Sequence, residues 1–273
     1  MNMSIEELES SLKKHRGSVF KYYTTSRIGF FDDLMVRFTQ AKEFEDVLEC
    51  QPVFVYHESI PLLEKRAIKS LQREGKFCYT RDMIKSEIKK LRKINYEEEA
   101  KKSYNDKLEM IGILSLAKTQ YNEHLWNKYA KDGFCIEFDG ENNFFSNRRD
   151  DPIGTGELFE VLYSDNQVVF DVNCLLDEDK EYTQLKVFYQ KKEKWKPEDE
   201  VRIIRFRNLA DNELDGGKIS LFRVPHEAVK TVYFSPNASN DFIEKCRNKM
   251  QMTLPRVPLY KIKDISALNI DRL

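Results

Sequence analysis

The stretch EKWKPEDEVRIIRF, Glu193–Phe206, places three consecutive acidic residues before a segment whose alternating apolar and basic residues predict a β-strand. Glu198 and Glu200 are two residues apart, so a strand that already includes them directs both carboxylates to one face and Asp199 to the other. Paired carboxylates on one face indicate a reactive site. Acidic residues beside Arg202 also fit charge neutralisation at a solvated sheet edge, and the strand by itself leaves both interpretations open.

The composition is that of an ordinary globular protein. Of 273 residues, 41% are hydrophobic and 33% are charged, which predicts one folded domain over residues 1–273. The net charge of -1 gives no overall attraction to nucleic acid or to an anionic membrane. Five cysteines, odd in number and without a Cys-x-x-Cys pair, indicate reduced thiols and a cytoplasmic protein. No apolar run approaches the roughly 18 residues of a membrane span, so we expect no membrane partner.

The motifs of the commonest enzyme classes are missing from the sequence. It has no Gly-x-Gly-x-x-Gly, no phosphate-binding loop, no Gly-x-Ser-x-Gly and no His-Glu-x-x-His. The four histidines do not lie at metal-ligand spacing with each other or with a cysteine, so no metal site is predicted. A function must therefore be sought in less common patterns.

The hydrophobic periodicity predicts an α+β fold. Strand-like segments lie at residues 18–24, 111–117, 133–139, 157–165, 200–206, 218–224, 229–235 and 256–262, and helical segments at 61–72, 81–104, 122–132, 171–195 and 239–250. The two kinds are interleaved without a regular β-α-β rhythm. We therefore expect a mixed, mostly antiparallel central sheet flanked by helices.

A charged helical insertion is expected at about residues 58–107. In its second helix, Ile84, Ile88 and Leu91 recur at helical spacing and leave the lysines on the opposite face. That face fits a basic surface for nucleic acid. It also fits a solvated face whose charge is offset by Glu97–Glu99.

Five segments carry a resemblance to a known family. LWNKYAKDGFCIEFD (Leu125–Asp139) closely resembles the bacterial domain-of-unknown-function family 2971 (DUF2971), in which a Trp and a Tyr-Ala pair precede a Gly-Phe/Val-x-Ile-x-Phe-Asp strand. The segments VFKYYTT, VRFTQAKEFEDVLE, ILSLAK and WKPEDEVRII are similar to other family motifs in the same order. The resemblance covers nearly the whole chain but implies no reaction.

A second, weaker resemblance implies a reaction. A basic residue on the first strand, a serine on a middle strand and a Glu-x-Glu opening a later strand resemble the ADP-ribosyltransferase superfamily, which suggests an ADP-ribosyltransferase-like fold. The resemblance implies that Lys21 holds the adenosine ribose or a phosphate of NAD, that Ser115 supports the nicotinamide ribose, and that Glu200 or Glu198 binds the ribose 2′-hydroxyl. NAD would be the substrate, and a protein or nucleic acid the acceptor.

The chemistry of such a reaction suits these residue types. Breaking the nicotinamide–ribose bond develops oxocarbenium charge on the sugar, which a fixed carboxylate stabilises, while a second carboxylate takes the proton of the nucleophile. Aromatic rings would clamp the dinucleotide, and Tyr22, Tyr23 and Tyr129 are the candidates. The resemblance thus implies an NAD-consuming bacterial enzyme, such as a toxin or a phage-defence effector.

Two other functions remain open at this stage. One is a non-catalytic binding or sensing module for a protein or nucleic-acid partner. The other is a metal-dependent nuclease that uses Asp46, Glu49, Glu198 and Glu200 as ligands. Convergence of Lys21 and Ser115 with Glu200 in one cleft favours the transferase, and a Glu200 that pairs with Arg202 at an exposed edge favours the binding module.

Overall fold

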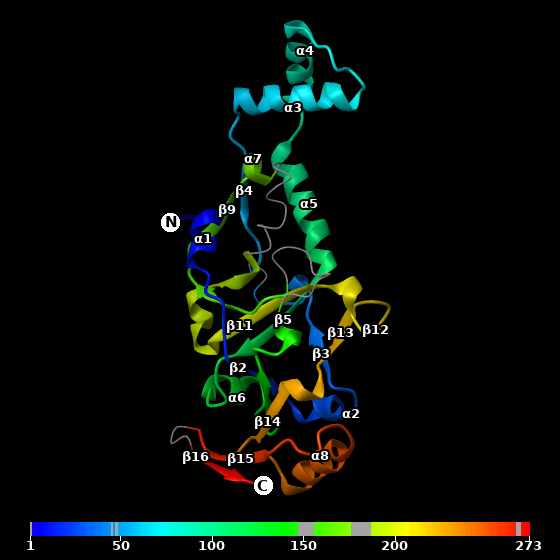
Figure 1. The fold of residues 1–273 in the computed structure, drawn as a ribbon. Coiled ribbons are helices and arrows are strands. Elements are labelled where there is room, and N and C mark those ends of the chain that lie inside the picture. Colours follow the sequence, from blue (N-terminus) through cyan, green and yellow to red (C-terminus); the bar gives the residue numbers. More distant parts are fainter. Residues whose placement is uncertain (1, 45, 47–48, 147–155, 176–186, 266–268) are drawn as a thin grey trace.

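The computed structural model describes residues 2–44, 46, 49–146, 156–175, 187–265 and 269–273. One eight-stranded sheet forms its centre, in the order β16-β15-β14-β6-β2-β5-β11-β7 (Figure 1). In that order the strands are Asn269–Arg272, Leu259–Asp264, Val229–Phe234, Phe134–Asp139, Ser18–Tyr23, Ile111–Ala117, Glu200–Phe206 and Phe159–Glu160. All neighbours are antiparallel except β14 and β15. The predicted α+β class with a mixed, mostly antiparallel sheet is confirmed.

Three smaller sheets lie around this centre. They are β1-β9-β4 (Asn2–Ser4, Gln167–Asp171, Val53–Val55), β10-β8 (Gln190–Lys191, Leu162–Tyr163) and β12-β13-β3 (Asn212–Leu214, Ile219–Arg223, Met35–Phe38). The first two are parallel and the third is antiparallel. A bridge between Thr39 and Ile113 ties the end of β3 to the central sheet.

Short helices cover the body of the molecule. The α-helices are α1 (Ile5–Ser11), α2 (Phe30–Asp33), α6 (Glu123–Tyr129), α7 (Val172–Leu175) and α8 (Asn240–Thr253), and 3-10 helices lie at Thr25–Gly29, Ala41–Glu43, Asn143–Phe145, Glu193–Glu198, Arg207–Leu209 and His226–Ala228. In the described parts of the chain, no helix is both long enough and apolar enough to cross a membrane.

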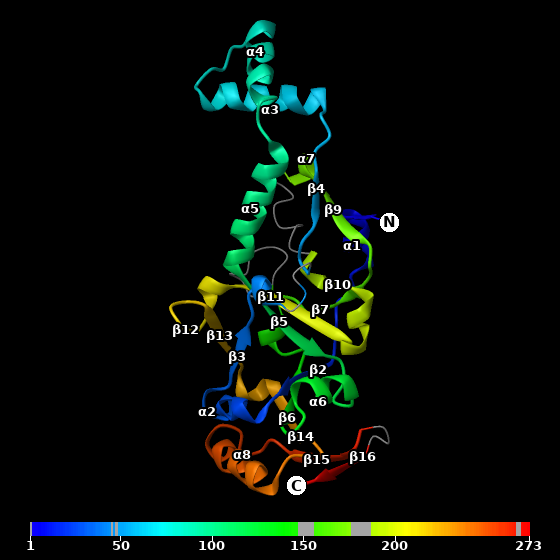
Figure 2. The same ribbon diagram turned by 180° about the vertical axis from the view of Figure 1, so that it is seen from behind.

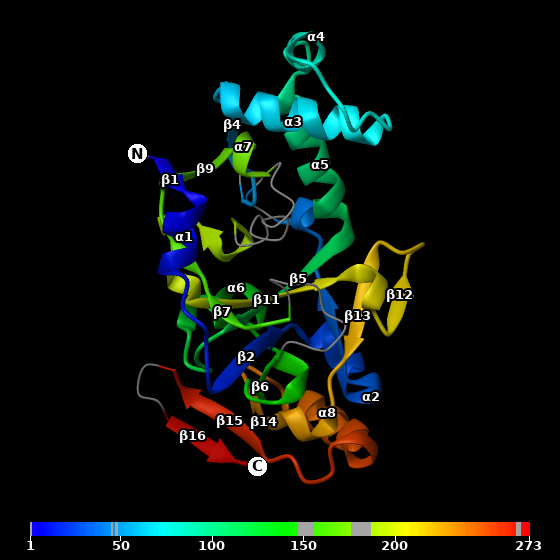
Figure 3. The same cartoon turned by 45° about the horizontal axis from the view of Figure 1, so that its top comes forward.

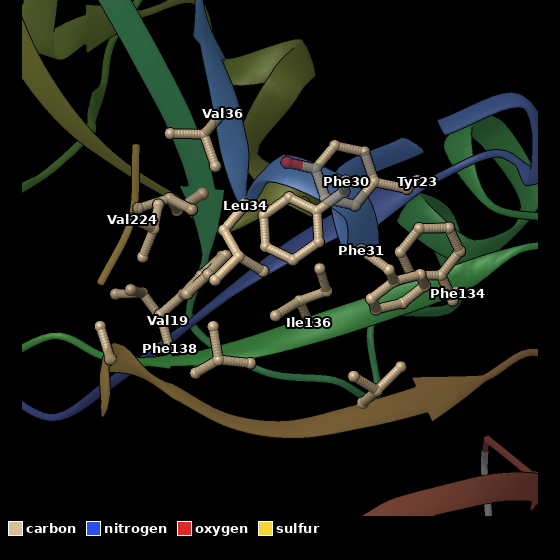
Figure 4. Packing of buried hydrophobic residues seen from close by; sticks show 14 of the residues in the cluster. Val19, Tyr23, Phe30, Phe31, Leu34, Val36, Phe134, Ile136, Phe138 and Val224 are labelled. Carbon is tan, nitrogen blue, oxygen red and sulfur yellow. The ribbon is translucent and has the colours of Figure 1, made fainter. Parts of the chain in front are cut away.

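Strand β2 is buried on both of its faces. Val19 and Tyr23 pack with Phe30 and Phe31 of α2 in the largest core cluster (Figure 4). Phe20 and Tyr22, on the opposite face, pack against α6 in a second cluster. Burial of both faces fixes the register of β2, because a shift by one residue would exchange the two sets of side chains.

A pair of helices projects from one end of the molecule (Figures 1 and 2). Helices α3 (Ile60–Arg73) and α4 (Arg81–Leu91) pack against each other, and α5 (Tyr96–Met110) connects them to β5. We call residues 58–95 the helical arm. The view in Figure 3 shows the same arm lying beyond the sheets at the end opposite α8.

The single helix expected at residues 81–104 is wrong, because the chain forms two helices. Asn95 caps α5, its side-chain oxygen accepting the backbone N–H of Glu98 at 3.3 Å. Three acidic residues, Glu97–Glu99, occupy the first turn, where they are favoured by the helix dipole. These local signals start a new helix and so end the old one.

The single helix expected at residues 171–195 is also wrong over the described residues of that segment. Helix α7 ends at Leu175, residues 176–186 lie outside the described residues, and Gln190–Lys191 form β10. The carbonyl oxygen of Lys191 accepts the N–H of Ser164 at 2.9 Å, so a strand contact replaces the helical hydrogen bond. This change of structure decides where Lys191 lies.

Candidate functional site

Three strands that are far apart in sequence are neighbours in the central sheet and carry the predicted site. β2, β5 and β11 lie side by side and contribute Lys21, Ser115 and Glu200. All three residues line one cleft of about 280 Å³, together with Glu198 and Tyr129. The structure therefore brings together most of the residues singled out in the sequence.

Lys21 reaches the cleft where β2 and β5 separate. These strands share a single pair of partners, Phe20 and Ala117, whereas β2 pairs with β6 along its whole length. The Lys21 ammonium donates a hydrogen bond to the carbonyl oxygen of Ser115 at 2.7 Å. Burial lowers the pKa of Lys21 to about 8 against the opposing effect of Glu200. Lys21 thus places a cation whose proton is weakly held next to Ser115.

Glu200 lies at the centre of the site and is 3% exposed. Its carboxylate accepts hydrogen bonds from Arg202 Nε at 2.6 Å, from Lys191 Nζ at 3.0 Å and from the Ser115 hydroxyl. Burial by itself raises the pKa of Glu200, but the charges of Arg202 and Lys191 outweigh it and bring the pKa down to about 2. The carboxylate is therefore ionised at neutral pH.

Arg202 is 1% exposed and is surrounded by acceptors. It donates to Glu49 and to the carbonyl oxygen of Phe188 in addition to Glu200. Arg205 is fully buried as well. The interpretation of the acidic triplet as neutralising a solvated sheet edge is therefore wrong, because β11 lies between β5 and β7 and its arginines are in the interior.

Glu198 and Glu200 are close to each other, but not because they alternate along one strand. Glu193–Glu198 form a 3-10 helix, and Asp199 adopts a left-handed conformation with φ of 45° before β11 begins at Glu200. Asp199 then points away from the cleft to Lys118, at 2.8 Å. The expected strand start before Glu198 is wrong, although the expected separation of Asp199 from the two glutamates is found.

Lys191 joins the two glutamates. Its Nζ lies 2.6 Å from Glu198 Oε2 and 3.0 Å from Glu200 Oε2. The other oxygen of Glu198 accepts from Lys128 Nζ and from the Tyr129 hydroxyl, each at 3.2 Å. Two carboxylates thus share one ammonium, which holds them together without mutual repulsion.

An indole forms one side of the cleft. Trp195 lines the cleft, and the ammonium groups of Lys128 and Lys194 lie 4.3 and 5.0 Å from its ring centroid. Its Nε1 donates to Asp46 at 3.3 Å. The side chain of Lys194 is 60% exposed, so an exposed ammonium lies beside the indole that lines the cleft.

The three tyrosine candidates have different surroundings. Tyr129 lines the cleft and is 38% exposed. Tyr22 also lines it, but its hydroxyl donates to Thr119 O at 2.7 Å and its ring packs edge-on against Trp126. Tyr23 lies in the core on the other face of β2, stacked on Phe30 at 5.9 Å, and is not among the residues that line the cleft.

The four carboxylates considered for a metal site do converge, but on cations of the protein. Lys191 lies 4.0 Å from Glu49 and contacts both Glu198 and Glu200, and Lys194 lies 3.3 Å from Asp46. Among the residues that the structure describes, no group of three or more His, Cys, Asp or Glu is arranged to hold a metal ion. This donor set fits ion pairing better than a nuclease centre.

Lys191 and Lys128 were missed in the sequence. Lys191 lies in a segment whose pattern predicts a helix, and Lys128 lies on the polar side of α6. One signal is present in the sequence: the lysine-rich run QKKEKWK, residues 190–196, is separated from the acidic triplet only by Pro197. Opposite charges so close in sequence indicate that lysines of the run fold back onto the glutamates.

Residues 125–203 match the model of a family described as Protein of unknown function (DUF2971). The matched segment begins on α6 and ends on β11, so it includes Tyr129, Lys191, Glu198 and Glu200. The resemblance to DUF2971 expected from the sequence is confirmed over this segment. The comparison with curated proteins gives no match, and the comparison with solved structures gives none either.

Proposed function

We propose that the cleft binds NAD, cleaves its nicotinamide–ribose bond and transfers ADP-ribose to an acceptor. The observation that supports this most is the adjacency of β2, β5 and β11, which places Lys21, Ser115 and Glu200 in one cleft. A hydrogen bond from the Ser115 hydroxyl to the Glu200 carboxylate links these two residues. The glutamate is ionised, as a group that faces a developing positive charge must be.

In the proposed reaction the bond between ribose C1′ and the nicotinamide nitrogen breaks, and its electron pair leaves with nicotinamide. Glu200 faces the positive charge that develops on the ribose. The nucleophile of the acceptor, a protein or a nucleic acid, forms the new bond to C1′ and gives its proton to Glu198. Lys191 holds the two carboxylates in place for these separate tasks.

The size of the cleft suits part of the dinucleotide. Small-molecule pockets typically measure about 300 to 1,000 Å³, and this one measures about 280 Å³. We assign the nicotinamide riboside half to the cleft. The diphosphate would then lie beside Trp195, where the ammonium groups of Lys128 and Lys194 favour an anion.

The test is release of nicotinamide from labelled NAD, in the presence of a bacterial lysate as the source of acceptor. We expect Glu200→Gln and Ser115→Ala to lower the rate, the first by about 100-fold or more. Glu193→Gln is the matched control, because Glu193 lies on the same 3-10 helix as Glu198 but is 45% exposed. Equal rates in all four proteins, or none in the wild type, would overturn the proposal.

An enzyme that consumes NAD would lower the NAD content of the cell that contains it. We therefore propose that the protein acts as a toxin or a phage-defence effector. Induced expression in a bacterial host tests this role. We expect growth arrest with the wild type and normal growth with Glu200→Gln at equal protein level. Normal growth with both proteins would reject the proposed role but would not contradict the proposed reaction.

A second candidate is a binding or sensing module without catalysis. It is favoured by the ion pairs of Glu200, whose carboxylate already has Arg202 and Lys191 as partners. Titration calorimetry separates the two candidates. Heat of NAD binding without nicotinamide release would favour the module.

A further inference from the structure

The charges of this nearly neutral chain are segregated. The helical arm, residues 58–95, contains 11 Lys and Arg against 5 Asp and Glu, a net charge of +6. The whole chain contains 45 against 46, so the remaining residues carry a net charge of -7. A local basic surface thus exists although the overall charge is -1.

The arm is a built element with its own packing. Leu63, Ala67 and Leu71 of α3 are buried, α3 packs against α4, and Glu87 of α4 accepts a hydrogen bond from Ser70 of α3 at 2.8 Å. Most of the exposed residues of the arm are charged. The arm therefore offers little apolar surface for a protein partner or a bilayer.

The base of the arm is fixed to the body. Arg66 lies 4.8 Å from the ring centroid of Tyr96, and Tyr56 packs on the same ring at 4.8 Å. Arg92 pairs with Glu58 at 2.7 Å across the two connections. The arm is thus held in a defined direction, which favours recognition of an extended ligand.

The exposed cations follow the helical period. Lys65, Lys69 and Arg73 on α3 are four residues apart, as are Arg81, Lys85 and Lys89 on α4, and all six are exposed. Each set therefore forms a stripe along one side of its helix. At the turn between the helices, Phe77 is 77% exposed and stands next to Lys76.

We propose that the helical arm binds single-stranded nucleic acid. The two stripes contact phosphates, and Phe77 offers a ring on which an unpaired base stacks. A membrane is less well suited, because the cations run along the sides of the arm and only two aromatic residues, Phe77 and Tyr79, stand at its turn. The inference rests on the arm alone and is independent of the reaction proposed for the cleft.

The test is fluorescence anisotropy of the full chain with a labelled 20-nucleotide single-stranded RNA over a series of salt concentrations. We expect the triple variant Lys65→Gln, Lys85→Gln and Lys89→Gln to bind at least about 10-fold more weakly. Its slope of log affinity against log salt should be shallower by roughly 2, at about 0.7 per lost phosphate contact. The matched control replaces three exposed lysines of the body, Lys218, Lys245 and Lys263, by glutamine.

Phe77→Ala separates stacking from charge. We expect about 10-fold weaker binding with an unchanged salt slope, whereas Met252→Ala, at the 89% exposed Met252 of α8, should have no effect. Equal affinity of the arm variant and the lysine control would overturn the proposal. So would binding to vesicles that contain anionic lipid without binding to RNA, which would assign the arm to membranes.

Discussion

The cleft and the helical arm are both rich in charged side chains, but those of the cleft are largely buried and those of the arm are mostly exposed. In the cleft, Glu200 and Arg202 are nearly inaccessible, and each contacts several partners of opposite charge. On the arm, lysines and arginines stand on exposed helix faces. The difference shows what solvent decides: a charge removed from water needs a partner that compensates its desolvation, and a charge left in water does not.

The largest loss of stability is expected from Arg202→Met. The change leaves Glu200 and Glu49 buried without their guanidinium, and breaking a buried pair in this way typically costs about 3 to 5 kcal/mol. The free energy of unfolding from urea titration measures the loss. Arg92→Met is the control, because the Arg92–Glu58 pair is about half exposed at both ends and should contribute under about 1 kcal/mol. A similar loss of unfolding free energy in the two variants would contradict the distinction between buried and exposed ion pairs.

Acid unfolding tests the buried carboxylate of Glu200. The pKa of Glu200 is about 2 in the folded protein against an ordinary value of 4.5, so below pH 4.5 the unfolded chain binds a proton that the folded one does not. Ionised Glu200 therefore contributes about 3 kcal/mol of stability above pH 4.5, which is lost as the pH falls towards 2. Stability curves of the wild type and Glu200→Gln should converge over that range, and parallel curves would contradict the low pKa.

Lys21→Met tests a second cation of the cleft. The variant keeps a long apolar side chain but loses the ammonium beside Ser115. If NAD is the ligand, we expect about 10-fold weaker binding in titration calorimetry, equivalent to about 1.4 kcal/mol. Lys230→Met, on the exposed side of β14, is the matched control. Unchanged affinity in Lys21→Met would remove Lys21 from the binding site.

The smallest effect is expected on the arm. The triple change of Lys65, Lys85 and Lys89 to glutamine should alter the free energy of unfolding by less than about 0.5 kcal/mol per site, because these side chains are exposed. Chemical denaturation measures this directly. A loss comparable to that of Arg202→Met would show that the arm depends on its lysines for folding.

Local signals in the sequence were sufficient for some features. The alternation in EVRIIRF predicted β11, and the order of Lys21, Ser115 and Glu200, read through a resemblance, named residues that line one cleft. The helix start at Asn95 also carried a local signal, an Asn followed by three glutamates, which the longer apolar period concealed.

Other features depend on contacts between distant segments. Lys191 joins Glu198 to Glu200 only because Gln190–Lys191 pair with β8, and no periodicity within residues 171–195 indicates that pairing. The left-handed Asp199 is equally hidden, since most residues adopt that conformation only when the surrounding structure requires it. Tyr22 and Tyr23 are adjacent in the sequence, but adjacent strand residues face opposite sides. Their side chains therefore lie in different core clusters.

The segregated charge of the arm and the body has a consequence for the protein in solution. A molecule with +6 at one end and -7 over the rest is strongly polar, so the arm of one copy attracts the body of the next. We expect head-to-tail self-association and poor solubility at low ionic strength, both relieved by added salt, which screens the attraction. The overall charge of -1 would not reveal this behaviour.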